Sequence, residues 1–210
     1  FTSDNGGMEG YPGEVITDNY PLDKGKISAM EGGTRVPLII TGPGIPKGVE
    51  SQVMVNGLDF YPTLLSLTGT ERPKGKNLDG ADLSDLLLKD PSNPKLVKNK
   101  DGKPRDTMVW HFPHSVALES TIRVGGYKLV RNYNHRFEEG RTEHELYQLY
   151  KKENGKQVRV DIEEVNNLAS QNPELTNRLN QKLSSILDEM DASYPYFNPQ
   201  SSRVLSLIHI

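Results

Sequence analysis

The sequence of 210 residues contains no cysteine, which excludes disulfide bonds, thiolate metal sites and a cysteine nucleophile within it. It also has no apolar run near the roughly 20 residues that a membrane-spanning helix requires. Charge of one sign is not in large excess, since the formal net charge is -3. Without a global positive field, neither nucleic acid nor an anionic membrane is expected as a partner.

The two ends of the sequence point to a piece of a longer protein. It opens on Phe1 rather than on Met, directly before an Asp-Asn-Gly-Gly turn, so we expect the true N-terminus, with any signal peptide, to lie upstream. Residues 205–210 read Leu-Ser-Leu-Ile-His-Ile, which back-translates to the mosaic-end adapter of transposase-based sequencing libraries. We expect an adapter-derived tail there; the alternative is an ordinary apolar tail.

Short apolar segments between glycine-rich turns occupy the first part of the chain. Residues 36–40 are apolar and partly β-branched, which predicts a buried strand. A helix is predicted over residues 60–67, with Asp59 as its N-cap and Gly69 at its end. Asp82 is expected to cap a second, short helix.

The second part of the chain predicts an antiparallel sheet. Residues 91–105 are rich in proline, lysine and asparagine, with few apolar residues to pack, and are predicted to be a linker. Beyond them, Gly125-Gly126 and Asn154-Gly155 are predicted hairpin turns between β-rich segments. The strands are predicted at residues 108–112, 121–124, 127–130, 146–150 and 157–161.

A helix is predicted near the end of the chain, capped by Asn172 with Pro173 at its first position. Its apolar residues recur at helical spacing, so this stripe should cover one face of the sheet. The stripe consists of Leu175, Leu179, Leu183, Ile186, Leu187 and Met190. Four aromatic residues are expected in the core of the sheet: Trp110, Tyr127, Tyr147 and Tyr150.

Two adjacent side chains with oxygen donors, Asp4 and Asn5, stand on a turn after a strand-like segment. A carboxylate beside a neutral amide oxygen favours calcium or magnesium over zinc; a plain turn is the alternative. Downstream, residues 25–37 carry glycines, an arginine and a proline that predict a tightly folded crossing. Lys26 in that segment is free to face an anion, although a solvated lysine is the alternative.

Several strings of the sequence occur in the order and rough spacing of the arylsulfatase A-like, formylglycine-dependent sulfatases of the alkaline phosphatase-like superfamily. The chain therefore resembles the C-terminal part of such an enzyme, from Phe1 to about Pro199. The strings are FTSDNGG, GK(x)4EGGTRVPLI, GPGIPKG, LDFYPTLLSLTG, DGADLSDLL, WHFPH, TIRVGGYKLV, ELYQL and NNLA.

The resemblance implies an α/β fold with two parts. Residues 1–90 would end the large alkaline phosphatase-like domain, residues 91–105 would link, and residues 106–204 would form a small antiparallel sheet packed by a C-terminal helix. It also implies hydrolysis of sulfate esters, of an aryl or a carbohydrate type, and a periplasmic or secreted location.

The resemblance assigns roles to particular residues. Asp4 and Asn5 would be calcium ligands, and Lys26 would bind the sulfate group and stabilise its leaving oxygen. His111 and His114 would contact substrate at the mouth of the site; the alternative is that they are packed, hydrogen-bonded histidines. The nucleophile would be a formylglycine made from a Cys/Ser-x-Pro-x-Arg motif upstream, so this chain alone is expected to be inactive.

Two other positions are informative. Arg35 is expected to be structural and to pair with Glu31, and Ile27 stands where the family more often has glycine. Arg123 and Lys128 are expected to be ordinary side chains of the hairpin.

Two alternative functions stay open on the sequence. One is a phosphoester or phosphonate hydrolase of the same superfamily, although Asn5 argues against its two-zinc members. The other is a non-catalytic, calcium-stabilised module. An upstream Cys or Ser before x-Pro-x-Arg would distinguish a sulfatase from the first alternative, and a natural Met start with a capping element ahead of Phe1 would support the second.

Overall fold

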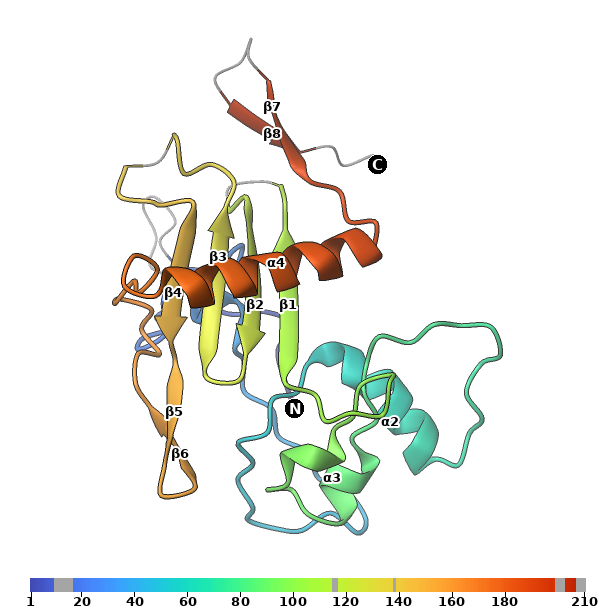
Figure 1. The fold of residues 1–210 in the computed structure, drawn as a ribbon. Coiled ribbons are helices and arrows are strands. Elements are labelled where there is room, and N and C mark those ends of the chain that lie inside the picture. The colour runs from blue at the N-terminus through green and yellow to red at the C-terminus, as the bar shows by residue number, and fades with distance from the viewer. Residues whose placement is uncertain (10–16, 115–116, 138, 199–202, 207–210) are drawn as a thin grey trace. The chain divides into compact units, whose positions relative to one another are not determined.

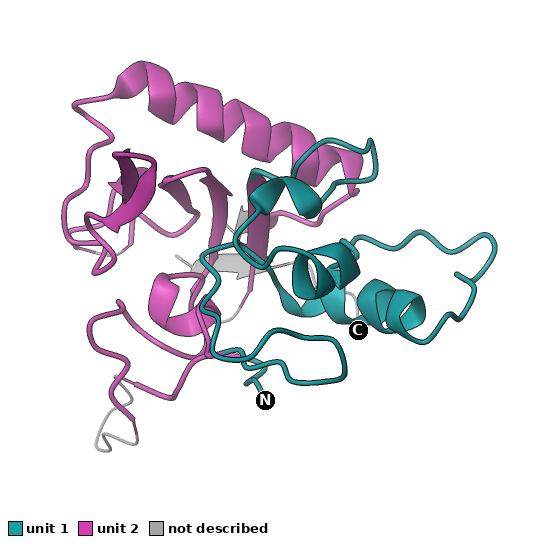
Figure 2. Cartoon of the chain, turned by 90° about the horizontal axis from the view of Figure 1, so that it is seen from below, with its two compact units in different colours: residues 1–4, 38–106 teal, residues 5–37, 107–210 magenta. Residues whose placement is uncertain are grey.

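The computed structural model describes residues 1–9, 17–114, 117–137, 139–198 and 203–206 (Figure 1). The chain forms two compact units, one of residues 1–4 and 38–106, the other of residues 5–37 and 107–210 (Figure 2). Residues 5–37 therefore group with the second unit, although much of the first unit follows them in sequence. No helix in the described ranges is long and apolar enough to cross a membrane.

The second unit is built on a four-stranded antiparallel sheet, as the turn pattern predicts. Its strands lie in the order β1-β2-β3-β4 (Figure 1). They are β1 Thr107–Phe112, β2 Glu119–Val124, β3 Tyr127–Asn132 and β4 His144–Gln148. Val124 pairs with Tyr127 across the Gly125-Gly126 turn, where Gly125 has a φ of +57°. A Cβ at Gly126 would lie 2.1 Å from the Tyr150 carbonyl oxygen, so the second glycine is needed for close approach.

A second hairpin continues from this sheet. Strands β5 Tyr150–Glu153 and β6 Lys156–Arg159 pair across Asn154-Gly155, and both turn residues have positive φ. The predicted strand at residues 146–150 is divided, because its first residues pair with β3 while Tyr150 begins the hairpin.

Helix α4, Pro173–Glu189, covers one face of the four-stranded sheet (Figure 1). Its buried leucines pack against alternate residues of the central strands, which confirms the predicted stripe except at its end. Met190 is 62% exposed because it follows the last turn. The core of this face contains Ile122, Leu129, Leu146, Leu179, Leu183 and Leu187. Asn172 precedes the helix, but its side chain makes no capping hydrogen bond.

The opposite face of the sheet has its own apolar cluster. Val130 and Tyr147 follow directly on Leu129 and Leu146, so their side chains point away from α4. Met30, beside the short helix α1 (Glu31–Thr34), packs in this second cluster. The sheet is thus covered on both faces, with the segment around Met30 on the face opposite the long helix.

The end of the chain forms one more hairpin, from β7 Pro195–Asn198 and β8 Arg203–Ser206. The expected adapter-derived tail begins inside β8 and continues into residues 207–210, which lie outside the described residues.

The regular elements of the first unit are short helices joined by turns and irregular segments. The unit contains η1 Gly57–Asp59, α2 Phe60–Leu67, α3 Ser84–Leu88 and η2 Pro94–Leu96. Its core is formed by Ala81, Leu83, Leu86 and Val97. Val97 lies in the predicted linker yet is 1% exposed, because this stretch turns back and packs its few apolar side chains.

Three local predictions for the first unit are wrong in instructive ways. Asp59 does not cap α2: its carboxylate accepts the Ala81 N–H at 2.8 Å and pairs with Arg105 at 2.7 Å. The predicted strand at residues 36–40 is reduced to a single bridge between Thr2 and Leu38, and Ile39 is 59% exposed. A strand is buried only when neighbouring strands flank it, and the described residues supply this one pairing. Asp82 accepts the Ser84 N–H at 2.9 Å, but Leu83 is the N-cap of α3 and makes no side-chain capping bond, so Asp82, the predicted cap, stands one residue before the cap position.

Candidate active site

Two backbone hydrogen bonds bring the turn after Asn5 against the segment that carries Lys26. The Gly6 N–H donates to the Gly33 carbonyl at 2.9 Å, and the Lys26 N–H donates to the Gly7 carbonyl at 2.9 Å. A Cβ at Gly6 would lie 1.6 Å from the carbonyl oxygen of Gly32, so this crossing requires a glycine. The tightly folded crossing predicted from the sequence is therefore present.

Asn19 fastens the same two segments together. Its amide oxygen accepts the Gly7 N–H at 3.1 Å, and its amide nitrogen donates to the carbonyls of Gly7 and Lys24. The Glu9 carboxylate in turn accepts from the side chain of Asn19 at 2.9 Å. Sequence reasoning missed Asn19, because a single asparagine between polar neighbours carries no motif.

The backbone around Lys26 is unusual. Lys24 and Ile27 have φ values of +56° and +70°, in the left-handed region that favours glycine. The side chain of Lys26 is exposed. Within the described part of the chain, its ammonium group has no ion-pair partner, so its charge is available to an anion.

The two expected calcium ligands are Asp4, which is exposed, and Asn5, which is half-buried. Their carboxylate and amide oxygens are donors of the kind that calcium prefers. Among the described residues, no group of three or more His, Asp or Glu side chains is placed to hold a metal. Asp4 and Asn5 thus fit a calcium site in part, and an ion that takes roughly six to eight oxygens would need further ligands.

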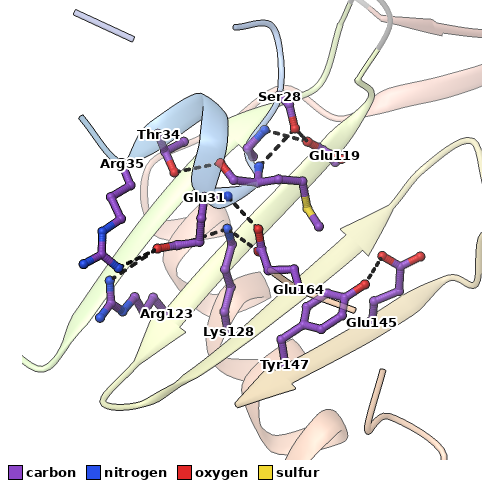
Figure 3. A network of polar contacts seen from close by, with 12 residues as sticks. Ser28, Glu31, Thr34, Arg35, Glu119, Arg123, Lys128, Glu145, Tyr147 and Glu164 are labelled. Carbon is purple, nitrogen blue, oxygen red and sulfur yellow. Dashed lines mark hydrogen bonds and ion pairs between the residues drawn. The ribbon is translucent and has the colours of Figure 1, made fainter. Parts of the chain in front are cut away.

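Glu31, five residues after Lys26, belongs to a buried network of charged side chains (Figure 3). Lys128, on β3, is fully buried, with its Nζ 2.7 Å from Glu164 Oε1 and 3.2 Å from Glu31 Oε1. Glu31 also lies 3.6 Å from Arg35, which confirms the predicted pair, and 4.0 Å from Arg123. The expectation that Lys128 is an ordinary hairpin side chain is wrong, because the face on which it lies is covered.

Burial and the neighbouring charges shift the pKa values of the groups in this network. Burial raises the pKa of Glu31, but Lys128, Arg123 and Arg35 outweigh it, and the net pKa is lowered. Burial raises the pKa of Glu164 to about 7, even though Lys128 opposes that rise. Lys128 itself is buried, yet the two carboxylates raise its pKa and keep it charged.

A second buried carboxylate contacts the same segment. Glu119 Oε1 accepts the Ala29 N–H at 2.6 Å and the Ser28 hydroxyl at 3.0 Å. Its other oxygen lies 3.3 Å from Arg141. Sequence reasoning missed both Glu119 and Glu164, because they are distant from Lys26 along the chain and belong to no local motif.

His111 is held by hydrogen bonds at both ring nitrogens. Nε2 lies 2.8 Å from the Ser193 carbonyl and must donate, so Nδ1 accepts from the Ser120 hydroxyl at 2.6 Å. Burial lowers the pKa of His111, which favours the neutral ring. The ring of His114 lies 4.3 Å from that of Phe112. For His111 these contacts favour the packed alternative, and substrate contact by either histidine stays a prediction.

Comparison with known proteins identifies the class of protein as sulfatase. The chain belongs to the family described as N-sulphoglucosamine sulphohydrolase, C-terminal, which matches residues 23–189. This confirms the resemblance to the C-terminal region of a sulfatase.

Among its relatives, a protein of Formosa agariphila named Sulfatase is 32% identical over 202 residues, with 91% of this chain and 33% of that protein covered. Arylsulfatase K of Homo sapiens is 30% identical over 177 residues, covering 83% of this chain and 30% of that protein. The chain thus spans about a third of the length of these curated relatives.

Solved structures show the same fold. A Bacteroides thetaiotaomicron protein, solved in work on the metabolism of multiple glycosaminoglycans, matches with a TM-score of 0.54 at 26% identity, over 78% of this chain and 31% of that one. A putative sulfatase of Bacteroides fragilis matches with a TM-score of 0.54 at 22% identity, over 77% of this chain and 31% of that one. The four-stranded antiparallel sheet with its C-terminal helix is therefore the C-terminal portion of a sulfatase fold.

Proposed function

We propose that the intact protein hydrolyses sulfate esters and that this chain contributes Lys26, Asp4 and Asn5 to its active site. The observation that carries the proposal is the exposed side chain of Lys26, which has no ion-pair partner among the described residues, on a segment hydrogen-bonded to the Asn5-Gly6-Gly7 turn. Membership of the sulfatase family supports it. The family description and the glycosaminoglycan context of one related structure favour a sulfated carbohydrate as the natural substrate, and the relatives named Arylsulfatase K support turnover of simple aryl sulfates in an assay.

The chemistry of Lys26 follows from the charge of the substrate. A sulfate monoester carries negative charge on its peripheral oxygens, and more charge develops on the leaving oxygen as the S–O bond breaks. A fixed ammonium near that oxygen stabilises the transition state more than the ground state. Asp4 and Asn5 would hold a calcium ion, which would supply positive charge at the sulfate oxygens. A formylglycine upstream would supply the nucleophile.

Substitution of Lys26 tests the proposal in the intact protein. Lys26→Ala should lower kcat by about two orders of magnitude, the scale of losing one preorganised charge in an active site. Lys24→Ala is the control, since Lys24 is an exposed lysine two residues away. Equal turnover in the two variants would contradict the role of Lys26, as would a large loss of thermal stability with normal turnover.

Removal of the two oxygen donors tests the metal site. Asp4→Ala should sharply reduce both bound calcium and turnover, because a methyl group cannot replace a carboxylate ligand. Asn5→Ala should act in the same direction but more mildly. Calcium content and turnover equal to wild type in both variants would overturn the assignment.

We also propose a periplasmic or secreted location, which rests on the family resemblance. Fractionation of the source cells, followed by detection of the intact protein, would test it. Recovery only in the cytosolic fraction would contradict it.

A further inference from the structure

The main chain that follows Lys26 is held by two buried carboxylates from the sheet side of the unit. Glu119 Oε1 accepts the Ala29 N–H at 2.6 Å, and Glu164 Oε2 accepts the Glu31 N–H at 2.7 Å. The Ser28 hydroxyl adds a further bond to Glu119 at 3.0 Å. Charge-assisted hydrogen bonds of this kind are roughly twice as strong as neutral ones.

Each of the two carboxylates forms an ion pair through its other oxygen. Arg141 lies 3.3 Å from the free oxygen of Glu119, and Lys128 lies 2.7 Å from that of Glu164. Burying such pairs costs desolvation energy that well-packed apolar side chains would avoid. Stability alone therefore gives little reason for two buried ion pairs beside residues 28–31. The need to fix the backbone of these residues does give a reason.

The conformation of Glu164 points the same way. It has a φ of +54°, which is unfavourable for a residue with a long side chain. Asp161 holds this turn, because its carboxylate accepts the N–H groups of Val165 and Asn166 at 3.1 and 2.9 Å. Strained backbone of this kind persists where the surroundings fix it, and is found disproportionately at functional positions.

We propose that Glu119 and Glu164 are positioning residues for Lys26, fixing residues 28–31 so that the ammonium group is presented in one place. The N–H of Lys26 is held on its other side by the Gly7 carbonyl, so the main chain is anchored before and after the side chain. The inference rests on the proposed function, because it gives Lys26 the role of stabilising the leaving oxygen.

The proposal predicts that loss of either positioning residue lowers the reaction rate by a factor that depends on the leaving group. Displacement of a catalytic group by about 1 Å can cost on the order of 100-fold in rate. If Lys26 stabilises charge on the leaving oxygen, displacement of Lys26 should lower the rate most for a substrate with a poor leaving group, because that oxygen depends most on external stabilisation. A variant that merely unfolds part of the enzyme would instead lose the same factor on every substrate.

The experiment compares three variants of the intact enzyme at neighbouring positions. Glu164→Met removes both the charge and the acceptor for the Glu31 N–H, whereas Glu164→Gln keeps an acceptor oxygen. Glu163→Gln removes the charge of the adjacent, exposed glutamate and serves as the control. Two measurements are made: hydrogen exchange of a peptide covering residues 28–35, and kcat/KM for phenyl sulfate and 4-nitrophenyl sulfate.

In Glu164→Met, exchange of this peptide should accelerate, and kcat/KM for phenyl sulfate should fall about tenfold further than for 4-nitrophenyl sulfate. Glu164→Gln should recover most of both losses, and Glu163→Gln should match wild type. Equal loss on the two substrates, or no recovery in Glu164→Gln, would overturn the positioning role. Should Glu164→Met fail to fold, Ser28→Ala, which removes one bond to Glu119, should show the same selective loss to a smaller extent; an equal loss would overturn the proposal.

The same experiment separates this inference from the function on which it rests. If the wild-type enzyme does not turn over either sulfate, the proposed function fails, while the exchange measurement still reports whether Glu164 holds the segment. If Lys26→Ala loses the same factor on both substrates, the role of Lys26 at the leaving oxygen fails. Selective loss in Lys26→Ala without selective loss in Glu164→Met overturns the positioning role alone.

Discussion

At the scale of single residues, Ile27 shows how the segment beside Lys26 is constrained. Its φ of +70° is rare for a β-branched residue, because the Cβ approaches the following carbonyl oxygen. The resemblance to sulfatases implies glycine as the commoner residue at this position. The backbone conformation supplies the reason, since glycine adopts a positive φ without that contact.

The first prediction follows from this conformation. In this chain, Ile27→Gly should be more stable than Ile27→Ala by about 1 kcal/mol, because alanine keeps the unfavourable Cβ. The order should reverse at Ser185, an exposed position within α4, where alanine is favoured over glycine by about 1 kcal/mol. Urea denaturation of the four variants measures both differences. Alanine more stable than glycine at both positions would contradict the left-handed conformation of Ile27.

His111 gives a prediction about pH. Because burial lowers its folded-state pKa, the unfolded state binds the proton more readily than the folded state does. The contribution of His111 is therefore present above the unfolded pKa of about 6.5 and is lost as the pH falls below it. Between about pH 7.5 and pH 5.5 the contribution of His111 should therefore lower the unfolding free energy, whereas Glu164, whose pKa is raised to about 7, contributes in the opposite direction.

The histidine responsible can be identified by substitution. As the pH falls, the unfolding free energy of His111→Gln should rise relative to that of wild type, because the variant lacks the ring whose protonation the folded state disfavours. Urea midpoints at the two pH values measure the effect. An unchanged slope in His111→Gln would show that its two hydrogen bonds do not depend on a neutral ring.

At the scale of elements, the sequence predicts what depends on local chemistry. The hairpin at Gly125-Gly126 and the helix α4 were predicted from turn residues and from helical periodicity, and both are present. The buried strand at residues 36–40 is not, because burial depends on neighbours that no local pattern contains. Asp59 fails as a helix cap for a similar reason: Arg105, 46 residues away, takes its carboxylate.

The stripe of α4 gives a prediction at this scale. Leu183 is fully buried against the sheet, so Leu183→Ala should lower the unfolding free energy by about 2–5 kcal/mol through lost burial and the cavity left behind. Met190, at the end of the same stripe, is 62% exposed. Met190→Ala should therefore change stability by less than about 0.5 kcal/mol. Thermal or urea unfolding measures both, and equal losses would contradict the position of the helix.

At the scale of the whole molecule, the candidate site is only partly visible in the sequence. Asp4, Asn5 and Lys26 stand in strings that resemble a family. Glu119, Lys128 and Glu164 do not, because they meet the Lys26 segment only through folding of the second unit. Lys128 shows why: helix α4 covers one face of β3, but Met30 and α1 cover the other, so a lysine on that second face is buried too. If only the face under α4 were covered, as the sequence pattern predicts, Lys128 would be exposed to solvent.

The last prediction concerns the chain by itself. It contains no Cys/Ser-x-Pro-x-Arg sequence from which a formylglycine could be made. Binding and charge stabilisation by Asp4, Asn5 and Lys26 cannot replace a covalent nucleophile that divides the reaction into two easier steps. Purified residues 1–210, supplied with calcium and 4-nitrophenyl sulfate, should therefore show no saturable turnover, whereas the intact protein should show it under the same conditions. Turnover by the purified chain that disappears in its Lys26→Ala variant would mean that a nucleophile lies within these residues, and would contradict its placement upstream.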